Sequence, residues 1–395
     1  MPATRAAASR VLQLITTMNP DFGGPQEAVA QIGRSLHAAG IASDIATLDA
    51  PDTTWGGEEV VRLGPARLGH YCYSERLTPW LRSNAHRYSS MLVHGLWQYH
   101  GFATWRASRG AAIPYYVFPH GMLDPWFKHR YPLKHLKKQL YWPWAEYRVL
   151  RDANAVLFTT EEERLLARQS FAHYRVNEAV VGFGISDPPR GERAHFLHRY
   201  PHLRDKRIVL FLGRLHPKKG CDLLIDAFAA VAQSEPTLRL VMAGPDRDGY
   251  QATLMQRAGQ LGISEHICWT GMIEGDAKWG AYACAEVFVL PSHQENFGIS
   301  VAEALASGLP VLISDKVNIW REIAAARGGL VSQDTPEGTQ DLLRQWLALS
   351  PVEREQMGAN ALACFRKHFH IQATTARLAA TLRAPSCIPP RICAA

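Results

Sequence analysis

The sequence lacks the cysteine pattern of a disulfide framework or a zinc site. Such modules repeat cysteines at short, regular intervals. The seven cysteines here are odd in number, scattered and without a C-x-x-C pair; they are Cys72, Cys221, Cys268, Cys284, Cys364, Cys387 and Cys393. We therefore expect reduced thiols, as in a cytoplasmic protein.

Long apolar runs are also lacking. No stretch approaches the roughly 20 apolar residues that a membrane-spanning helix needs. The N-terminus, MPATRAAASRVLQLITTMNP, has the charged start and short apolar run of a signal peptide. Polar residues interrupt that run and no small-residue cleavage site follows it, so VLQLITT is predicted to be a first buried strand. The expected localisation is cytoplasmic, with a peripheral position on the inner membrane face left open.

The chain carries only a moderate excess of positive charge. The net charge is +7 and 20% of the 395 residues are charged. Such an excess indicates an anionic ligand or surface without specifying nucleic acid. A single core stops growing at roughly 250–300 residues, so the length predicts two domains.

Short apolar runs alternate with amphipathic segments along the chain. This pattern predicts an α/β protein with parallel sheets covered on both faces. The predicted strands are residues 11–16, 43–48, 90–95, 115–121, 155–159 and 179–184, then 207–213, 238–244, 266–271, 287–292 and 310–315.

A segment rich in proline, glycine and charge separates the two sets of strands. We predict an N-terminal domain over 1–187, a linker over 188–206 and a second domain over 207–370. Residues 371–395 are expected to form a helix returning toward the first domain, followed by a disordered, proline-rich tail. Two doubly wound domains facing across a cleft would bind ligands at the carboxyl ends of their strands.

The stretch HQENFGISVAE (293–303) places two carboxylates, Glu295 and Glu303, across a predicted strand-to-helix turn. Eight helical steps span roughly 12 Å. Glycosidase carboxylates lie at about 5–9.5 Å, so a hydrolytic pair fits poorly. Two contacts with one extended ligand fit better. The backbone N–H groups at the helix start would suit a phosphate that lies between the two carboxylates. The alternative, that Glu303 only faces solvent, stays open.

Two cations follow the strand 207–213. Arg214 stands at its carboxyl end, and Lys219 precedes a glycine and a helix. Fixed cations beside a helix start suit a diphosphate that is held and then leaves. A basic surface loop is the alternative.

The second half resembles the retaining glycosyltransferases of family 4, which have the GT-B fold. The residues that carry the resemblance are GRLHPKKGCDLLIDAF (213–228), VMAGPD (241–246) and LPSHQENFGISVAEALASGLPVLISD (290–315). It is strong over 207–325 and weaker in the first half.

The resemblance implies roles for these residues. Glu295 would contact the donor sugar, Glu303 the ribose hydroxyls, and Arg214 with Lys219 the diphosphate. Three backbone amides would cover the sugar and phosphate: those of Asn296, Phe297 and Gly298. No metal ligand and no cofactor is expected, and the D-x-D at 246–248 is interpreted as a turn.

In the first half, Gly23 and Gly24 stand between a strand and a helix, in a loop that closes over the diphosphate in the family. His120, before Gly121, would lie beside the sugar, and we include it with Glu295, Arg214 and Lys219 as catalytic.

Acceptor residues are less clearly marked. Asp124 is a weaker candidate for contact with the acceptor. His94, Trp97 and His100 form either an acceptor wall or core filling, because aromatic rings serve both purposes.

Basic and aromatic residues interleave between 128 and 151. This composition suits an anionic membrane surface, although a helix packed on its own domain remains an alternative; nucleic acid is not expected as a partner. The residues are Lys128, Arg130, Lys134, Lys137, Lys138, Arg148 and Arg151, with Tyr131, Tyr141, Trp142, Trp144 and Tyr147. Further on, Thr160 and Glu163 are predicted to form a capping box.

Together these features predict a retaining transferase. It would move a hexosyl group from a UDP- or GDP-linked sugar to an acceptor hydroxyl, on a lipid-linked glycan of bacterial exopolysaccharide or lipopolysaccharide. The alternatives are a sugar-nucleotide epimerase or phosphorylase of the same fold, or a non-catalytic subunit that binds a nucleotide sugar or a membrane.

Overall fold

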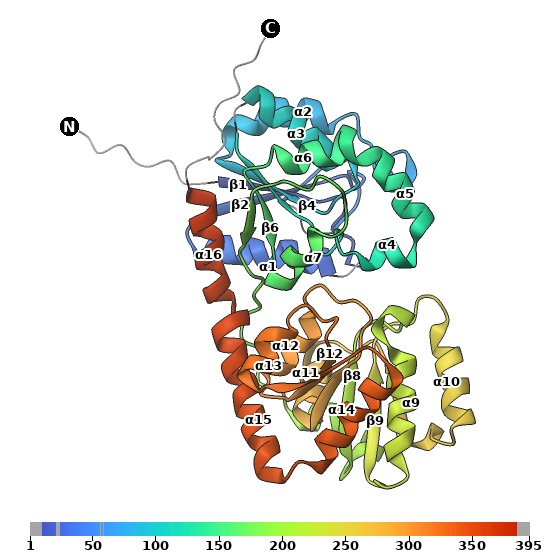
Figure 1. Ribbon diagram of the computed structural model, residues 1–395. Coiled ribbons are helices and arrows are strands. Elements are labelled where there is room, and N and C mark those ends of the chain that lie inside the picture. Colours follow the sequence, from blue (N-terminus) through green and yellow to red (C-terminus); the bar gives the residue numbers. More distant parts are fainter. Residues whose placement is uncertain (1–9, 21–23, 56, 58, 112, 385–395) are drawn as a thin grey trace, which may run out of the picture. The chain divides into compact units, whose positions relative to one another are not determined.

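The chain folds into two α/β units. The computed structural model describes residues 10–20, 24–55, 57, 59–111 and 113–384 (Figure 1). One unit lies within 1–184 and 374–395, and the other within 185–373. Each has one parallel sheet, which confirms the predicted class of two doubly wound domains.

The first unit has a seven-stranded sheet in the order β3-β2-β1-β4-β5-β6-β7. The strand order reverses between β1 and β4, and such switch points are where open α/β sheets bind ligands, beyond the carboxyl ends of the strands. The strands are β1 (Arg10–Leu14), β2 (Ala42–Thr47), β3 (Val60–Arg62), β4 (Ser90–His94), β5 (Tyr115–Phe118), β6 (Ala155–Phe158) and β7 (Glu178–Val180).

Both faces of this sheet are apolar, because successive side chains of a strand point to opposite sides. Leu12 and Val93 pack in one layer, whereas Val11, Leu92 and Tyr116 pack in the other. The helices are α1 (Gly24–Ala38), α2 (Leu77–Asn84), α3 (Tyr99–Ala111), α4 (Trp126–Arg130), α5 (Pro132–Tyr141), α6 (Tyr147–Arg151), α7 (Glu161–Ala167) and α16 (Ile371–Arg383), of which α16 contributes Leu378 to the second layer.

The second unit has a six-stranded sheet in the order β10-β9-β8-β11-β12-β13. Here the order reverses between β8 and β11, which pair in parallel. The loops that follow these two strands therefore leave the sheet side by side. The strands are β8 (Arg207–Leu212), β9 (Leu238–Ala243), β10 (Ile267–Gly271), β11 (Val287–Leu290), β12 (Val311–Ser314) and β13 (Gly329–Ser332).

Helices flank this second sheet. Among them, α14 packs against α9 and α11 packs against α8. They are α8 (Arg193–Arg199), α9 (Cys221–Ala232), α10 (Tyr250–Gln260), α11 (Gly275–Cys284), α12 (Ile299–Ala306), α13 (Trp320–Ala326), α14 (Pro336–Ala348) and α15 (Pro351–Cys364).

Some elements differ from expectation. The short strands β3 and β13 carry too few apolar residues in sequence to be predicted. The segment 188–206, predicted to be a linker, contains α8, because Phe196 is fully buried and fixes that helix on the second unit. The predicted disordered tail lies outside the described residues from 385 onward.

Candidate functional site

Lys219 and Glu295 meet where the sheet order of the second unit reverses. Lys219 ends a short 3₁₀ turn, Pro217–Lys219, in the loop after β8, and Glu295 lies in the loop after β11. The Lys219 ammonium forms an ion pair with the Glu295 carboxylate. Burial alone would raise the pKa of Glu295, but Lys219, Lys218 and a backbone hydrogen bond from Gly298 together hold that pKa below its ordinary value. Glu295 is therefore ionised at neutral pH.

Backbone contacts fix both loops. The N–H of Glu295 donates to the carbonyl of Lys316 at 2.9 Å, which ties this loop to the one after β12. Gly220, after Lys219, has φ of 64°, and a Cβ there would lie 2.1 Å from the carbonyl oxygen of Pro291. Gly298, with φ of 77°, is the N-cap of α12. Only glycine accepts both positive φ values without strain, so sequence and backbone together place the ion pair.

Glu303 is buried and paired. It lies on α12, where its carboxylate forms an ion pair with Lys278 and accepts a hydrogen bond from the Tyr282 hydroxyl at 3.0 Å. The alternative that Glu303 only faces solvent is wrong, since its exposed fraction is 8%. Lys278 was not predicted. Its four-residue spacing from Tyr282 on α11 was the available signal, because it puts both side chains on one helix face.

Arg214 and the three predicted amides have different environments. Arg214 is exposed after β8 and forms no ion pair with a described residue. Phe297 is buried, and its ring meets Phe369 edge-on with centroids 5.7 Å apart. Its side chain therefore belongs to the core, which leaves the backbone of Asn296, Phe297 and Gly298 as the part that a ligand could contact.

In the first unit, two histidine rings stack beyond β4 and β5. The ring centroids of His94 and His120 lie 5.2 Å apart, and Nδ1 of His94 is 3.0 Å from Nε2 of His120. On the other side, Nε2 of His94 is 3.1 Å from Oε1 of Gln13 in β1. The Gln13 amide nitrogen donates to Ser43 Oγ at 2.9 Å.

These contacts determine the tautomers of both rings. Because the amide nitrogen of Gln13 faces Ser43, its oxygen accepts the Nε2 proton of His94. Nδ1 of His94 then accepts from Nε2–H of His120. The proton of neutral His120 is thus held on Nε2 and its Nδ1 carries a lone pair.

All three histidines of this region are neutral at neutral pH. Burial, followed by the neighbouring histidines, lowers the pKa of His94 well below its ordinary value. Burial also lowers the pKa of His100 and of His120 to about 4. His94 and His100 are each 1% exposed, so an acceptor cannot touch them as the predicted wall requires. His94 lies behind His120 instead.

The turn that carries His120 is held by a buried carboxylate. His120 and Gly121 have φ of 50° and 74°. The Gly121 N–H donates to Glu163 at 2.7 Å, and Glu163 also accepts from the N–H of Thr159 at 2.8 Å. Thr160 caps α7 as predicted by accepting from the Glu163 N–H at 2.9 Å. The second half of the predicted capping box is absent from this described helix end, because the carboxylate is turned toward Gly121.

The remaining predicted residues of this unit do not join the histidine cluster. Trp97 packs on Phe171 and Trp142 at centroid distances of 5.1 and 6.0 Å, which is core filling. Asp124 is buried and accepts from the N–H of Trp126 at 2.8 Å. Gly24 is the first residue of α1, with open space around it, whereas Gly23 lies outside the described residues.

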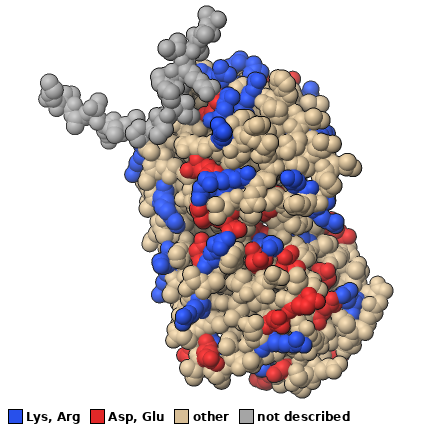
Figure 2. Space-filling view, viewed as in Figure 1, with Lys and Arg blue, Asp and Glu red and all other residues tan. Residues whose placement is uncertain are grey.

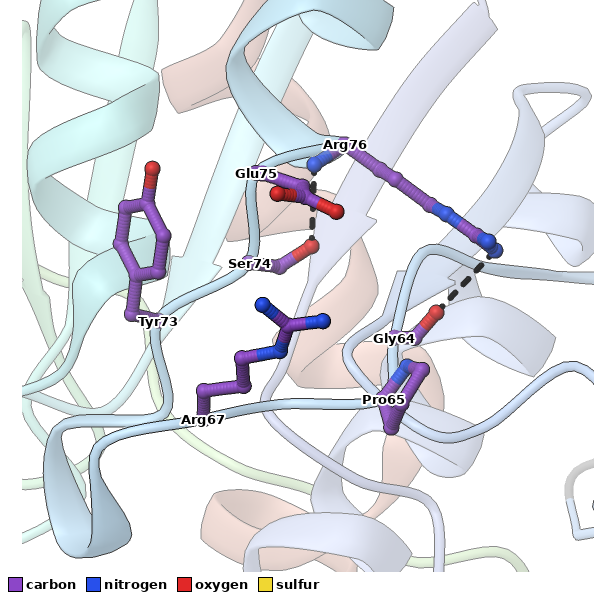
Figure 3. Close-up of a pocket in the computed structure, with 7 residues that line it drawn as sticks. All are labelled: Gly64, Pro65, Arg67, Tyr73, Ser74, Glu75 and Arg76. Carbon is purple, nitrogen blue, oxygen red and sulfur yellow. Dashed lines mark hydrogen bonds between the residues drawn. The ribbon is translucent and has the colours of Figure 1, made fainter.

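A small pocket beyond β3 contains none of the predicted residues (Figure 3). Its polar groups close the local turn. Ser74 donates to the carbonyl of Leu63, and Arg76 donates to the carbonyl of Gly64 at 3.2 Å. We interpret this pocket as structural.

The residues that the structure describes form neither a metal cluster nor a membrane-spanning helix. Within them, no group of three His, Cys, Asp or Glu side chains is arranged to hold a metal ion. Nor does any described helix have the length and apolar character to cross a bilayer.

Both halves of the chain match family models of glycosyl transferases. The family model for glycosyl transferases group 1 matches residues 196–363, and that for the glycosyl transferase 4-like domain matches 23–184. Mannosylfructose-phosphate synthase of Agrobacterium fabrum is 26% identical over 393 residues, which cover 91% of this chain and 82% of that protein.

Solved structures show the same fold. Sucrose-phosphate synthase from Thermosynechococcus elongatus aligns with a TM-score of 0.76 and 18% identity, covering 95% of this chain and 98% of that one. HepE of Anabaena, in complex with UDP and glucose, aligns with a TM-score of 0.76 and 17% identity over 95% and 99%. At such identities the likeness establishes the fold.

Proposed function

Because the chain belongs to the group 1 glycosyl transferases and has the GT-B fold, we propose that it is a retaining hexosyltransferase that uses a UDP- or GDP-linked sugar. The observation that carries the proposal is the half-buried Lys219–Glu295 ion pair at the β8–β11 switch point. A cation and an ionised carboxylate there can separate to hold the two ends of a sugar diphosphate. HepE, solved with UDP and glucose, supports this class of donor.

The proposed donor contacts follow from the pairs on the second unit. Lys219 turns from Glu295 to the diphosphate, joined by the exposed Arg214, and Glu295 then accepts from sugar hydroxyls. Glu303 accepts from the ribose hydroxyls in place of Lys278. The amides of residues 296–298 lie against the sugar and phosphates. No metal is needed where two cations neutralise the leaving group.

The reaction transfers the glycosyl group with its configuration kept. The bond from the anomeric carbon to the diphosphate breaks, and the acceptor oxygen bonds to that carbon from the same face. The acceptor proton passes to the departing diphosphate. Arg214 and Lys219 stabilise the charge that develops on that diphosphate. His120, neutral and fixed in one tautomer, lies against the sugar.

We propose a lipid-linked acceptor because of one helix. Leu133, Leu136, Leu140 and Trp144 are exposed by 82%, 60%, 72% and 71%. Their spacing of three, four and four residues places them on one side of α5 and its continuation, and Lys137 beside them is also exposed. An apolar stripe flanked by lysines suits an anionic membrane surface. On the face drawn in Figure 2, described Lys and Arg alternate with Asp and Glu, which favours no nucleic-acid interface.

Membrane binding is testable with vesicles. Sedimentation with anionic phosphatidylglycerol vesicles at low salt should retain the native chain, and Leu136→Ser with Leu140→Ser should release it. Equal binding of native and variant chains, or no binding by either, would contradict the membrane contact. The name of one relative, mannosylfructose-phosphate synthase, suggests a phosphorylated sugar as the alternative acceptor.

The donor is testable by thermal shift with UDP, GDP, ADP and their hexose conjugates. A ligand that binds only the folded chain raises the melting temperature. We expect one nucleotide family to stabilise the protein and Glu303→Ala to abolish that stabilisation. Lys278→Met is the matched control, since it removes the partner of Glu303 and keeps the carboxylate. Nucleotide release that needs an acceptor would exclude the epimerase, the phosphorylase and the non-catalytic subunit.

A further inference from the structure

A second pocket of the first unit lies on the inner side of α5, opposite the exposed leucines. Its lining comes mainly from α4, α5 and the residue between them, and from the turn that follows α7. Among the lining residues are Phe127, Tyr131, Lys134, His135, Lys138 and Phe171. Aromatic rings and cationic groups therefore face the same space. Neither the family models nor the relatives assign a function to it.

Two lysines of the pocket have no ion-pair partner among the described residues. Lys134 and Lys138 are one helical turn apart, so both point to the same side of α5. The Lys138 ammonium lies 4.5 Å from the ring centroid of Trp97, and that of Lys134 lies 5.0 Å from the ring of Tyr131. Aromatic faces hold both ammonium groups in place without neutralising them.

Two acidic groups lie near these lysines. Asp124 lines the pocket, with one oxygen accepting from the N–H of Trp126. Glu146 is buried behind Trp97, and burial raises its pKa to about 7, so it is only partly ionised at neutral pH. Burial, then Lys128 and Lys138, lowers the pKa of His135, as expected where the potential is positive.

The pocket drawn in Figure 3 provides a contrast within the same unit. There Arg76 and Ser74 donate to backbone carbonyls, and the carboxylate of Glu75 lines the same pocket as Arg67. In the pocket beside α5 the cations make no such bonds to the described chain, so they are available to a ligand.

We propose that this pocket binds the phosphate group of the acceptor, with the attached sugar ring packed against Phe127 and Tyr131. Lys134 and Lys138 meet the phosphate, because two ammonium groups one turn apart can share its oxygens. The inference rests on the proposed transferase function and adds that the acceptor is anionic. The phosphate comes either from a sugar phosphate in solution or from the linkage of a glycan to a lipid.

The test measures binding of three probes by isothermal calorimetry: glucose 6-phosphate, glucose, and phosphatidylcholine vesicles carrying a polyprenyl-diphosphate-linked glucose. A phosphorylated probe should bind, and glucose should bind far more weakly. Lys134→Ala and Lys138→Met should each weaken that binding by about tenfold or more. Methionine preserves the packing of the side-chain stem on Trp97, so loss of folding would not explain the result.

Lys137→Ala is the matched control. It removes the same charge from the same helix, but Lys137 does not line the pocket. With glucose 6-phosphate it should change binding by less than about twofold, since distant surface charges are screened. With the vesicle probe, binding to vesicles without the linked glucose is subtracted, because Lys137 flanks the proposed membrane surface. Equal losses of glucose 6-phosphate binding in all three variants, or no binding of either phosphorylated probe, would overturn the proposal.

The vesicle and solution arms distinguish the two sources of the phosphate. Dependence on Lys138 with the vesicle probe alone assigns a lipid-linked acceptor, and dependence with glucose 6-phosphate assigns a soluble one. Stabilisation by UDP or GDP is measured on the same variants and should be unchanged. Its absence in the native chain would reject the proposed donor, independently of the pocket.

Discussion

The two sheets each present a cluster of polar side chains where the strand order reverses, but the clusters differ in charge. In the first unit Gln13, His94 and His120 are linked by hydrogen bonds between neutral groups. In the second, Lys219 with Glu295 and Lys278 with Glu303 are ion pairs. The same fold thus supports a cluster that fixes proton positions and another that can exchange partners with a charged ligand.

The largest effect should come from breaking the charged cluster. Lys219→Ala should lower turnover by roughly 10²–10³-fold, the cost of losing one group that stabilises the leaving charge. Turnover is measured as nucleotide release with saturating acceptor. Lys218→Ala is the comparison: it removes the weaker of the two lysine charges that lower the Glu295 pKa, so it should cost far less turnover.

Near-normal transfer by Lys219→Ala would remove the diphosphate role. A matching circular dichroism spectrum is needed with it, because the variant leaves the half-buried Glu295 without its partner.

Acid should affect the two clusters at different pH. Buried histidines titrate at about 4 in the folded chain, against 6.5 ordinarily. The unfolded chain binds more protons between these values, so the stability that these rings confer falls as pH falls from 6.5 to 4. Glu295 has a lowered pKa, so its contribution is present above 4.5 and is lost only as pH falls through the folded value.

Hydrogen exchange separates these two windows. Protection factors, corrected for intrinsic rates, should fall first in β4 and β5 and later in β8 and β11. Loss of protection in both sheets at the same pH would mean that the charge difference does not govern their acid sensitivity.

The smallest effect should come from the neutral cluster. Gln13→Leu removes the acceptor for Nε2–H of His94 and allows both rings to change tautomer. We expect a loss of turnover of no more than about tenfold, because one hydrogen bond behind the reacting groups is altered. Nitrogen NMR of the imidazole rings should show mixed tautomers.

Gln13→Glu should preserve the tautomer, since a carboxylate still accepts from His94. If both variants gave the native imidazole spectrum, Gln13 would have no part in setting the proton positions.

The sequence predicts the fold well because most strands are buried on both faces and are therefore continuously apolar. It also predicts the Lys219 and Glu295 loops, since strand ends at a switch point converge. The Lys278–Glu303 pair was not predicted, because the spacing of Lys278 and Tyr282 on α11 does not say which side chain of α12 they meet. Sequence alone also does not distinguish Lys138, which lines a pocket, from its exposed neighbour Lys137, because the difference depends on how α5 packs on its own unit.

The glycine beside Lys219 has a consequence for how such a chain can vary. At Gly220 a methyl group would meet the Pro291 carbonyl at 2.1 Å, whereas at Gly24 nothing lies within 4 Å. In a saturation library selected for folded protein, position 220 should therefore return glycine codons almost alone. Position 24 should return codons for many different residues. The two glycines should therefore differ sharply in the number of substitutions that folded variants tolerate.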